Sequence, residues 1–144
     1  MFRFLYSANL VPEPDGGFVV TFPDFPEAIT QGEGVSDSLK QAADCLEEAI
    51  AGRIRRGQPI PIPAPIAEGG FSVSLSTLFS AKTALYLKMK SDKVSSTELA
   101  RRLGWKEKEI LRLLDPKHQS KMAQLEIALN TLGLQLVVEV RDAA

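Results

Sequence analysis

The feature that most constrains this fold is a proline-rich stretch near the middle of the 144-residue chain, GQPIPIPAPIAEGG, over residues 57–70. Four of its prolines stand at every second position. Because proline fixes φ and donates no backbone hydrogen bond, the stretch favours polyproline II over a helix or a central strand. We therefore expect two domains, residues 1–57 and residues 71–144, joined by a semi-rigid linker over residues 58–70.

The part before the linker alternates like strands and then changes to a helical period. Residues 2–11 and 17–22 are largely apolar runs around the turn PEPDGG, which predicts a β-hairpin. The stretch PDFP should interrupt the ladder, and residues 28–34 predict a short third strand. From Ser36, the expected N-cap, apolar residues recur at helical spacing as far as Gly57, which is placed to end the helix. This part predicts a small antiparallel sheet with one helix packed on it.

The part after the linker is mainly helical in its pattern. FSVSLS predicts a short strand over residues 71–76, and LQLVVEV predicts a closing strand over residues 134–140. Helical spacing between them predicts four helices, at residues 77–90, 95–103, 107–114 and 120–132. The closing strand would need to pair with residues 71–75 or with another subunit. The predicted class is α+β, a sheet-and-helix domain followed by a helical domain that ends in a strand.

Charge is distributed unequally along the chain. Residues 1–70 carry five Lys and Arg against ten Asp and Glu, a net of −5, whereas residues 71–144 carry twelve against eight, a net of +4. Halves of opposite sign suggest two partners of opposite charge, one of them a nucleic acid. No apolar run approaches the roughly eighteen residues of a membrane span, and the start does not read as a signal peptide. The single cysteine, Cys45, fits a reducing cytoplasm, where we expect the protein.

The most specific motif is SSTELARRLGWKEKEILRLLDP, over residues 95–116. Ala100 leaves room where two helices approach, and Gly104 permits a tight turn between them. The second helix has a polar, basic outer face, as a helix that enters the DNA major groove requires. The predicted DNA-binding residues are Ser95, Ser96, Arg101, Arg102, Lys106, Lys108 and Arg112. The alternative is a solvated basic face on an ordinary helical bundle.

The first half contains a group of carboxylates with a less specific pattern. They are Asp15, Asp24, Glu27, Glu33 and Asp37. A metal or acid–base site would need them to converge, normally beside a histidine or lysine, but the only histidine stands at position 118 in the other half. Turn and cap roles account for these acids better, so we expect no catalytic residue, no metal and no cofactor. FPDFPEA instead predicts an exposed aromatic and proline surface rimmed by acids, which suits a basic protein partner.

These stretches resemble the HicB antitoxins of HicA–HicB toxin–antitoxin systems. The resemblance runs through DGGFVVTFPDFPEAITQGEGVSDSLKQAADCLEEAI and GQPIPIPAP, over about residues 3–65. The second half resembles the lambda-repressor-like helix-turn-helix domain of one branch of that family, through LARRLG, EILRLLDP and LEIALNTLGLQLVVEV. One departure is FPEA, where many relatives have LPG, so Glu27 replaces a glycine and is expected to alter the local turn.

The resemblance implies a first domain with a partial RNase-H-like fold that lacks catalytic carboxylates and masks a HicA-type toxin, a small basic mRNA interferase. It implies a second domain that dimerises and binds the operator DNA of its own operon. The expected toxin-binding residues are Phe22, Asp24, Phe25, Pro26, Glu27 and Glu33. Two alternatives stay open, namely a transcriptional regulator whose first domain senses a small ligand, and a nuclease, for which convergent catalytic groups are missing.

Overall fold

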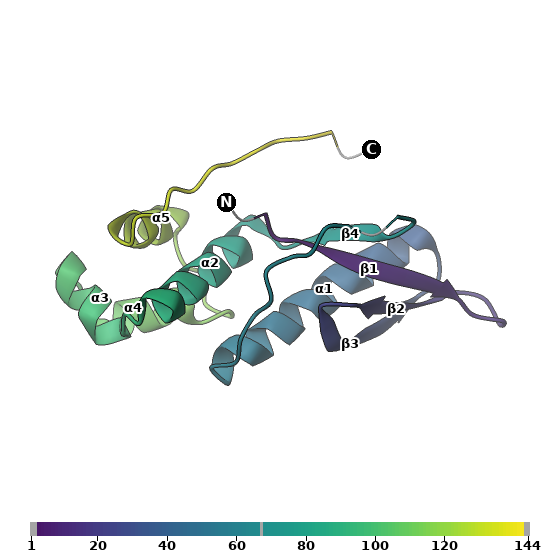
Figure 1. The fold of residues 1–144 in the computed structure, drawn as a ribbon, viewed down its shortest axis with the longest axis horizontal. Helices are drawn as coiled ribbons and strands as arrows, with labels where there is room; N and C mark the ends of the chain where they lie inside the picture. The colour runs from purple at the N-terminus through teal and green to yellow at the C-terminus, as the bar shows by residue number, and fades with distance from the viewer. Residues whose placement is uncertain (1–2, 67, 143–144) are drawn as a thin grey trace. The chain divides into compact units, whose positions relative to one another are not determined.

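The computed structural model describes residues 3–66 and 68–142. The chain forms two compact units, divided between Ser80 and Ala81. The first unit contains four strands and a helix, and these are β1 (Leu5–Pro12), β2 (Phe18–Phe22), β3 (Phe25–Gly32), α1 (Val35–Arg55) and β4 (Phe71–Ser74) (Figure 1). The expected α+β architecture is confirmed.

The sheet is antiparallel throughout, in the order β3-β2-β1-β4. β1 has eight residues and lies between β2 on one side and β4 on the other. Asn9 in its second half lies opposite Thr21 of β2, and Ala8 in its first half lies opposite Phe71 of β4. Pairing with β4 satisfies backbone groups of β1 that would otherwise lie at an open edge. β4 therefore belongs to the sheet of the first unit, rather than opening the second domain as the sequence pattern suggested.

A tight turn at Pro23 and Asp24 joins β2 to β3, with Phe22 opposite Phe25. The sequence analysis expected the third strand to begin only after the prolines of this stretch. In the structure, Pro26 lies inside β3. Because β3 is an edge strand, a residue that donates no hydrogen bond is tolerated there.

The start of α1 differs from the expected cap. The N-cap is Gly34, not Ser36, and the chain is already helical at Ser36. The connection is instead held by Asp37, whose carboxylate accepts a hydrogen bond from the Glu33 amide at 3.0 Å. Asp37 also lies in the first helical turn, where a negative charge is favourable.

Two glycines determine how α1 is connected to its surroundings. Gly32, the last residue of β3, lies so close to the buried Ser38 that a Cβ at position 32 would overlap it. At the other end, Gly57 has a φ of +66°, the left-handed conformation that commonly follows a helix. Its amide donates to the Ile54 carbonyl at 3.1 Å. The predicted end of the helix is confirmed.

The core of the first unit lies between α1 and the sheet. Ala42, Leu46 and Ile50 of α1 are fully buried, as their helical spacing predicted. They pack with buried sheet residues that include Tyr6 and Val20, and α1 contacts β3 most extensively of the four strands. Burying each large aliphatic side chain contributes roughly 1.5–3 kcal/mol, so this face is the main source of the unit's stability.

The proline-rich segment is not a free spacer between the two units. It connects α1 to β4, and both of these elements belong to the first unit. Ile60 is only 5% exposed. The Tyr6 hydroxyl donates to the Pro61 carbonyl at 2.8 Å, and Arg53 donates to the Pro59 carbonyl at 3.1 Å. Buried apolar and hydrogen-bonding contacts thus hold residues 58–61 against the first unit.

The second unit is helical, and α2 crosses the division at Ser80. Its helices are α2 (Thr77–Asp92), α3 (Ser96–Leu103), α4 (Glu107–Leu114) and α5 (Met122–Thr131). Its core is made of leucines and an isoleucine that are almost fully buried, namely Leu85, Leu99, Ile110, Leu113, Leu125 and Leu129. The four predicted helices are confirmed, with ends that differ by one or two residues.

The predicted closing strand is wrong for the isolated chain. Residues 134–140 form no strand in the described structure, and Val137, Val138 and Val140 are 75%, 74% and 90% exposed. A strand needs a neighbour, and residues 71–74, one of the two expected neighbours, pair with β1. Among the described residues, no helix has the length and apolarity needed to cross a membrane.

Candidate functional site

The first candidate site is formed by α3 and α4. Ser95 caps α3, and its Oγ accepts a hydrogen bond from the Glu98 amide at 3.1 Å. Gly104 has a φ of +69° and allows the chain to turn sharply, while the Trp105 amide donates to the Ala100 carbonyl at 2.9 Å. Since Ala100 is buried, it permits the close approach of the two helices that its small size predicted. A helix, a glycine turn and a second helix follow one another as the motif requires.

Helix α4 has two clearly different sides. Ile110 and Leu113 are buried in the unit. Lys108 and Arg112, four residues apart, lie on the opposite side and are exposed. Leu111 lies on that same side and is 52% exposed. The sequence analysis did not single out Leu111, although its spacing from Ile110 and Leu113 places it away from the apolar stripe.

The two arginines of α3 share one carboxylate. Arg101 binds Glu98 through Nε at 2.9 Å and Nη2 at 2.6 Å, and Arg102 Nε donates to the same residue at 3.0 Å. Hydrogen bonds from Arg101 and then from Arg102 lower the pKa of Glu98 to about 2. The guanidinium groups are therefore exposed but partly neutralised, so they differ from Lys108 and Arg112 as candidate contacts for an anion.

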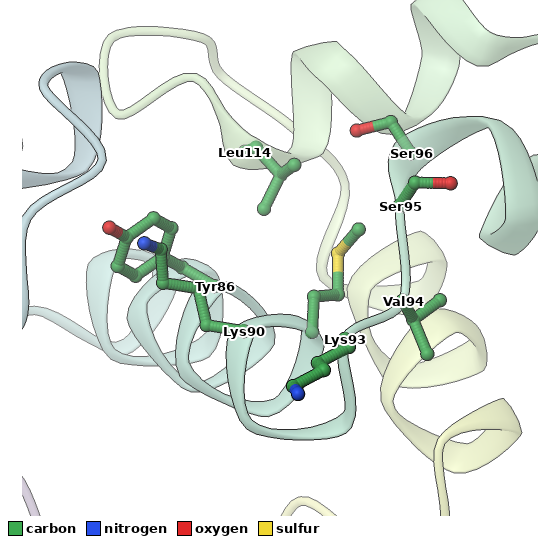
Figure 2. Close-up of a pocket in the computed structure, with 8 residues that line it drawn as sticks. Tyr86, Lys90, Lys93, Val94, Ser95, Ser96 and Leu114 are labelled. Atoms are coloured by element: carbon green, nitrogen blue, oxygen red, sulfur yellow. The ribbon is translucent and has the colours of Figure 1, made fainter.

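A shallow pocket of about 380 Å³ lies beside the start of α3 (Figure 2). Its lining is mainly apolar and consists of Tyr86, Met89, Lys90, Lys93, Val94, Ser95, Ser96 and Leu114. The Lys90 ammonium lies 5.8 Å from the centre of the Tyr86 ring. Ser95 and Ser96 lie where the chain enters α3, and their hydroxyls point in opposite directions (Figure 2).

The second candidate site is the turn between β2 and β3. Phe22 and Phe25 are only 2% and 0% exposed, and the Tyr6 ring meets the Phe25 ring edge-on with 5.0 Å between centroids. The expectation that this stretch exposes its aromatic rings is wrong, because both rings complete the core. The exposed residues of this stretch are Pro23, Pro26 and Glu27.

Glu27 is held by Arg53, a residue that the sequence analysis did not single out. Arg53 donates through Nε at 2.6 Å and through Nη2 at 2.8 Å to the two carboxylate oxygens. These hydrogen bonds lower the pKa of Glu27. The same guanidinium lies 4.7 Å from the centre of the Phe25 ring. Nothing in the local pattern could reveal the pair, since its members stand 26 residues apart.

The remaining acids of this site do not form a catalytic cluster. One carboxylate oxygen of Asp24 is buried and finds no hydrogen-bond partner among the described residues, whereas Glu33 is exposed at the start of α1. Within residues 3–66 and 68–142, no three His, Cys, Asp or Glu side chains converge as a metal site would require. Glu27 and Glu33 thus present carboxylates at the surface of the first unit.

Comparison with known proteins assigns the chain to a family. The model for the HicB-like antitoxin of bacterial toxin–antitoxin systems matches residues 5–84, which is more than half of the chain and includes β4. This chain therefore belongs to the HicB-like antitoxins of bacterial toxin–antitoxin systems.

Several relatives match across both units. Antitoxin HicB of Escherichia coli K12 is 33% identical over 131 residues, which cover 91% of this chain and 95% of the relative. Antitoxin HicB 1 of Photorhabdus laumondii is 32% identical over 135 residues, which cover 94% of this chain and 86% of the relative. Antitoxin HicB of Pseudomonas fluorescens Pf0-1 is 31% identical over 141 residues, which cover 97% of this chain and 96% of the relative. The similarity is thus not limited to the first unit.

Proposed function

We propose that this antitoxin neutralises a HicA-type mRNA interferase through its first unit and represses its own operon by binding operator DNA through its second. The observation that carries the proposal is the division of charge. Residues 1–80 carry five Lys and Arg against ten Asp and Glu, and residues 81–144 carry twelve against eight. A basic toxin is attracted by the first unit and DNA phosphate by the second.

In the DNA-binding half, α4 acts as the recognition helix. Lys108 and Arg112 project from its exposed side and can reach base edges or phosphates, and Lys106 precedes the helix. Leu111 adds an apolar contact of the kind that fits the methyl group of thymine. The hydroxyl of Ser96 and the free amides at the start of α3 suit a phosphate.

Arg101 and Arg102 take a different part in this proposal. In the free protein both bind Glu98. Phosphate oxygens compete with that carboxylate on DNA, so each arginine exchanges one anionic partner for another. Their net contribution is therefore smaller than that of Lys108 or Arg112, which adds a new pairing.

A two-fold operator requires a homodimer. The exposed valines of residues 134–140 suit pairing with the same segment of a second copy, which would turn this segment into a strand. Such pairing would also bury apolar surface that is solvent-exposed in the single chain.

The DNA-binding half is tested by the double variant Lys106→Ala/Arg112→Ala. Binding to a duplex of the DNA immediately upstream of the chain's own coding sequence should weaken, and the salt slope should fall by about two, since each lost phosphate contact removes roughly one released counterion. Lys40→Ala/Arg55→Ala removes the same charge from exposed positions in the first unit and serves as the control. Equal affinity of the test variant and the wild type would sink the assignment of α4.

In the toxin-binding half, the contact surface is the exposed part of the β2–β3 turn and the start of α1. Asp24 is partly exposed in this turn, and its negative charge would attract a lysine or arginine of a basic toxin. Pro26 and Glu27 are exposed just after it in β3, whereas Glu33 is exposed beyond the other end of β3, beside Gly17. Phe22 and Phe25 support the turn from the core instead of touching the partner.

The toxin-binding half is tested with the small basic protein encoded beside this gene. The full-length chain should restore growth of cells that express it, and Asp24→Asn/Glu33→Gln should slow association by an amount that shrinks at high salt. Asp44→Asn/Glu68→Gln removes the same charge from exposed positions of the first unit as the control. A wild-type chain that neither binds that protein nor restores growth would favour the regulator that senses a small ligand.

A further inference from the structure

Lys82 of α2 is a buried cation in the helical unit. Lys82 as a whole is only 1% exposed. The Nζ atom donates to the Arg112 carbonyl at 3.0 Å, to the Leu113 carbonyl at 3.0 Å and to the Ser120 Oγ at 2.7 Å. All three ammonium protons are used.

The acceptors of Lys82 stand at one place, the C-terminal end of α4 and the turn that follows it. The last carbonyls of a helix have no partner within the helix and carry the negative end of its dipole, so an ammonium group is well suited to them. Arg112 and Leu113 lie in the last turn of α4, which ends at Leu114. Lys82 therefore donates to the Leu113 carbonyl and joins the Asp115 amide as a donor to the Arg112 carbonyl.

Ser120 extends this contact into a network. Its hydroxyl has one proton, which is directed at the Arg112 carbonyl at 3.3 Å. Its oxygen accepts a hydrogen bond from Lys82 and lies 2.9 Å from the Nδ1 of His118. The turn is closed by the His118 amide, which donates to the Asp115 carbonyl at 3.1 Å. One ammonium group thus connects α2, the end of α4 and residues 115–120.

We propose that Lys82 is a positioning residue for operator binding, which holds the C-terminal end of α4 to α2 and so sets the direction in which α4 presents its exposed side. The inference rests on the proposed DNA-binding function of α4. Lys82 itself is buried and touches no DNA. It acts through the backbone carbonyl of Arg112, whose own side chain points to the exposed side with Lys108.

Stabilisation of the fold does not by itself explain why a lysine is buried at position 82. A buried ammonium group loses its hydration, and a well-packed apolar residue of similar volume often supports a fold equally well. Burial lowers the pKa of Lys82 to about 8, while the Asp115 carboxylate opposes the shift. Besides Asp115, the titratable group that faces this network is His118. What an apolar residue cannot reproduce is the direction of three hydrogen bonds onto one helix end.

The test compares Lys82→Met with the wild-type full chain. Methionine keeps the length and apolar character but donates no hydrogen bond. Affinity for the duplex upstream of the coding sequence should fall on the order of tenfold or more. The free energy of a hydrogen bond to a charged group typically corresponds to a factor of about that size in an equilibrium constant. Lys88→Met is the matched control on the same helix, where the lysine pairs with Asp92 near the surface, and it should change affinity by less than about threefold.

Two further readouts separate positioning from a simple loss of folding. Hydrogen exchange should quicken at the amides of Asp115, His118 and Ser120 in Lys82→Met, while amides of α3 keep their protection. As the pH rises through about 8, Lys82 loses its charge and one of its three donors, so wild-type affinity should fall more over that range than the affinity of Lys82→Met.

The outcomes are distinct. Wild-type affinity and unchanged exchange in a folded Lys82→Met would overturn the proposal, as would protection lost equally throughout the helical unit. If the wild-type chain fails to bind the duplex, while hydrogen exchange in Lys82→Met still quickens only at residues 115–120, the DNA-binding function is refuted. The contact by which Lys82 positions the end of α4 is then still supported. Weaker binding together with local exchange supports both.

Discussion

Arg53 connects three parts of the first unit, so replacing it is a demanding test of how this unit is held together. Its guanidinium binds both oxygens of Glu27, donates to the Pro59 carbonyl and lies over the Phe25 ring. Arg53→Met retains much of the apolar stem and removes the charge and all donors. The change should loosen β3 and the proline-rich segment from α1 while leaving the core residues in place.

The magnitude follows from three contributions. The side chains of Arg53 and Glu27 are 19% and 39% exposed, and a pair of this kind contributes about 0.5–1 kcal/mol after screening. The hydrogen bond to Pro59 contributes about 0.5–1 kcal/mol, and the contact with Phe25 a further 0.5–1 kcal/mol or so. Allowing for coupling between neighbours, we expect the free energy of unfolding of the first unit to fall by about 2 kcal/mol.

The chain offers an internal reference for the assay. Trp105 is the only tryptophan and lies in the second unit, so its fluorescence follows that unit during denaturant unfolding. Circular dichroism follows both units. Arg53→Met should therefore shift the dichroism transition and leave the fluorescence transition nearly unchanged, and Arg55→Met, an exposed residue in the same helical turn, should shift neither. A loss below about 0.5 kcal/mol, or an equal shift of the Trp105 transition, would refute the reasoning.

Three further expectations can be checked in the same way. Gly104→Ala places a side chain at a φ of +69° and should lower the free energy of unfolding followed by Trp105 by about 1 kcal/mol. Gly104→Asn should lower it less, because asparagine tolerates this conformation. An asparagine variant less stable than the alanine variant would contradict this explanation. Tyr6→Phe leaves the Pro61 carbonyl without its donor and should cost about 1 kcal/mol in the first unit at neutral pH. The pKa of Glu27 is lowered in the folded state, mainly by its hydrogen bonds from Arg53, so the stabilisation is present above the unfolded value near 4.3 and disappears as the pH falls through the folded value. The stability difference between wild type and Glu27→Gln, measured from neutral to acidic pH, should accordingly vanish, and a constant difference would contradict the assignment.

Much of the local structure could be predicted because it depends on near neighbours in the chain. Alternation identified β1 and β2, helical spacing identified α1 and its buried face, and Gly57 and Gly104 marked turns whose left-handed φ the structure confirms. The early start of β3 was missed because the proline rule was applied without knowing that this strand lies at an edge. The Gly34 cap was missed, and Ser36 was expected instead, because glycine and serine are both acceptable N-caps.

Only part of the candidate surfaces could be predicted from the sequence. The basic residues of α4 project from one exposed side as their spacing predicted, while the aromatic residues of the acidic turn complete the core instead of facing a partner. Periodicity reports which residues share a face of one element. It does not report whether a residue next to a tight turn points inward, as Phe25 at the start of β3 does against Tyr6.

By itself, therefore, the sequence determined the type of each main helix, the hairpin and the division of charge, because these depend on spacing over a few residues and on composition. Tertiary structure alone decided that β4 pairs with β1, that the proline-rich segment packs on the first unit, and that residues 134–140 stay unpaired within one chain. It also decided that Arg53 holds Glu27, 26 residues away, and that Lys82 holds the end of α4, 30 residues away. Such pairs form only after the fold brings distant residues within hydrogen-bonding distance, and their geometry leaves no periodic trace in the chain.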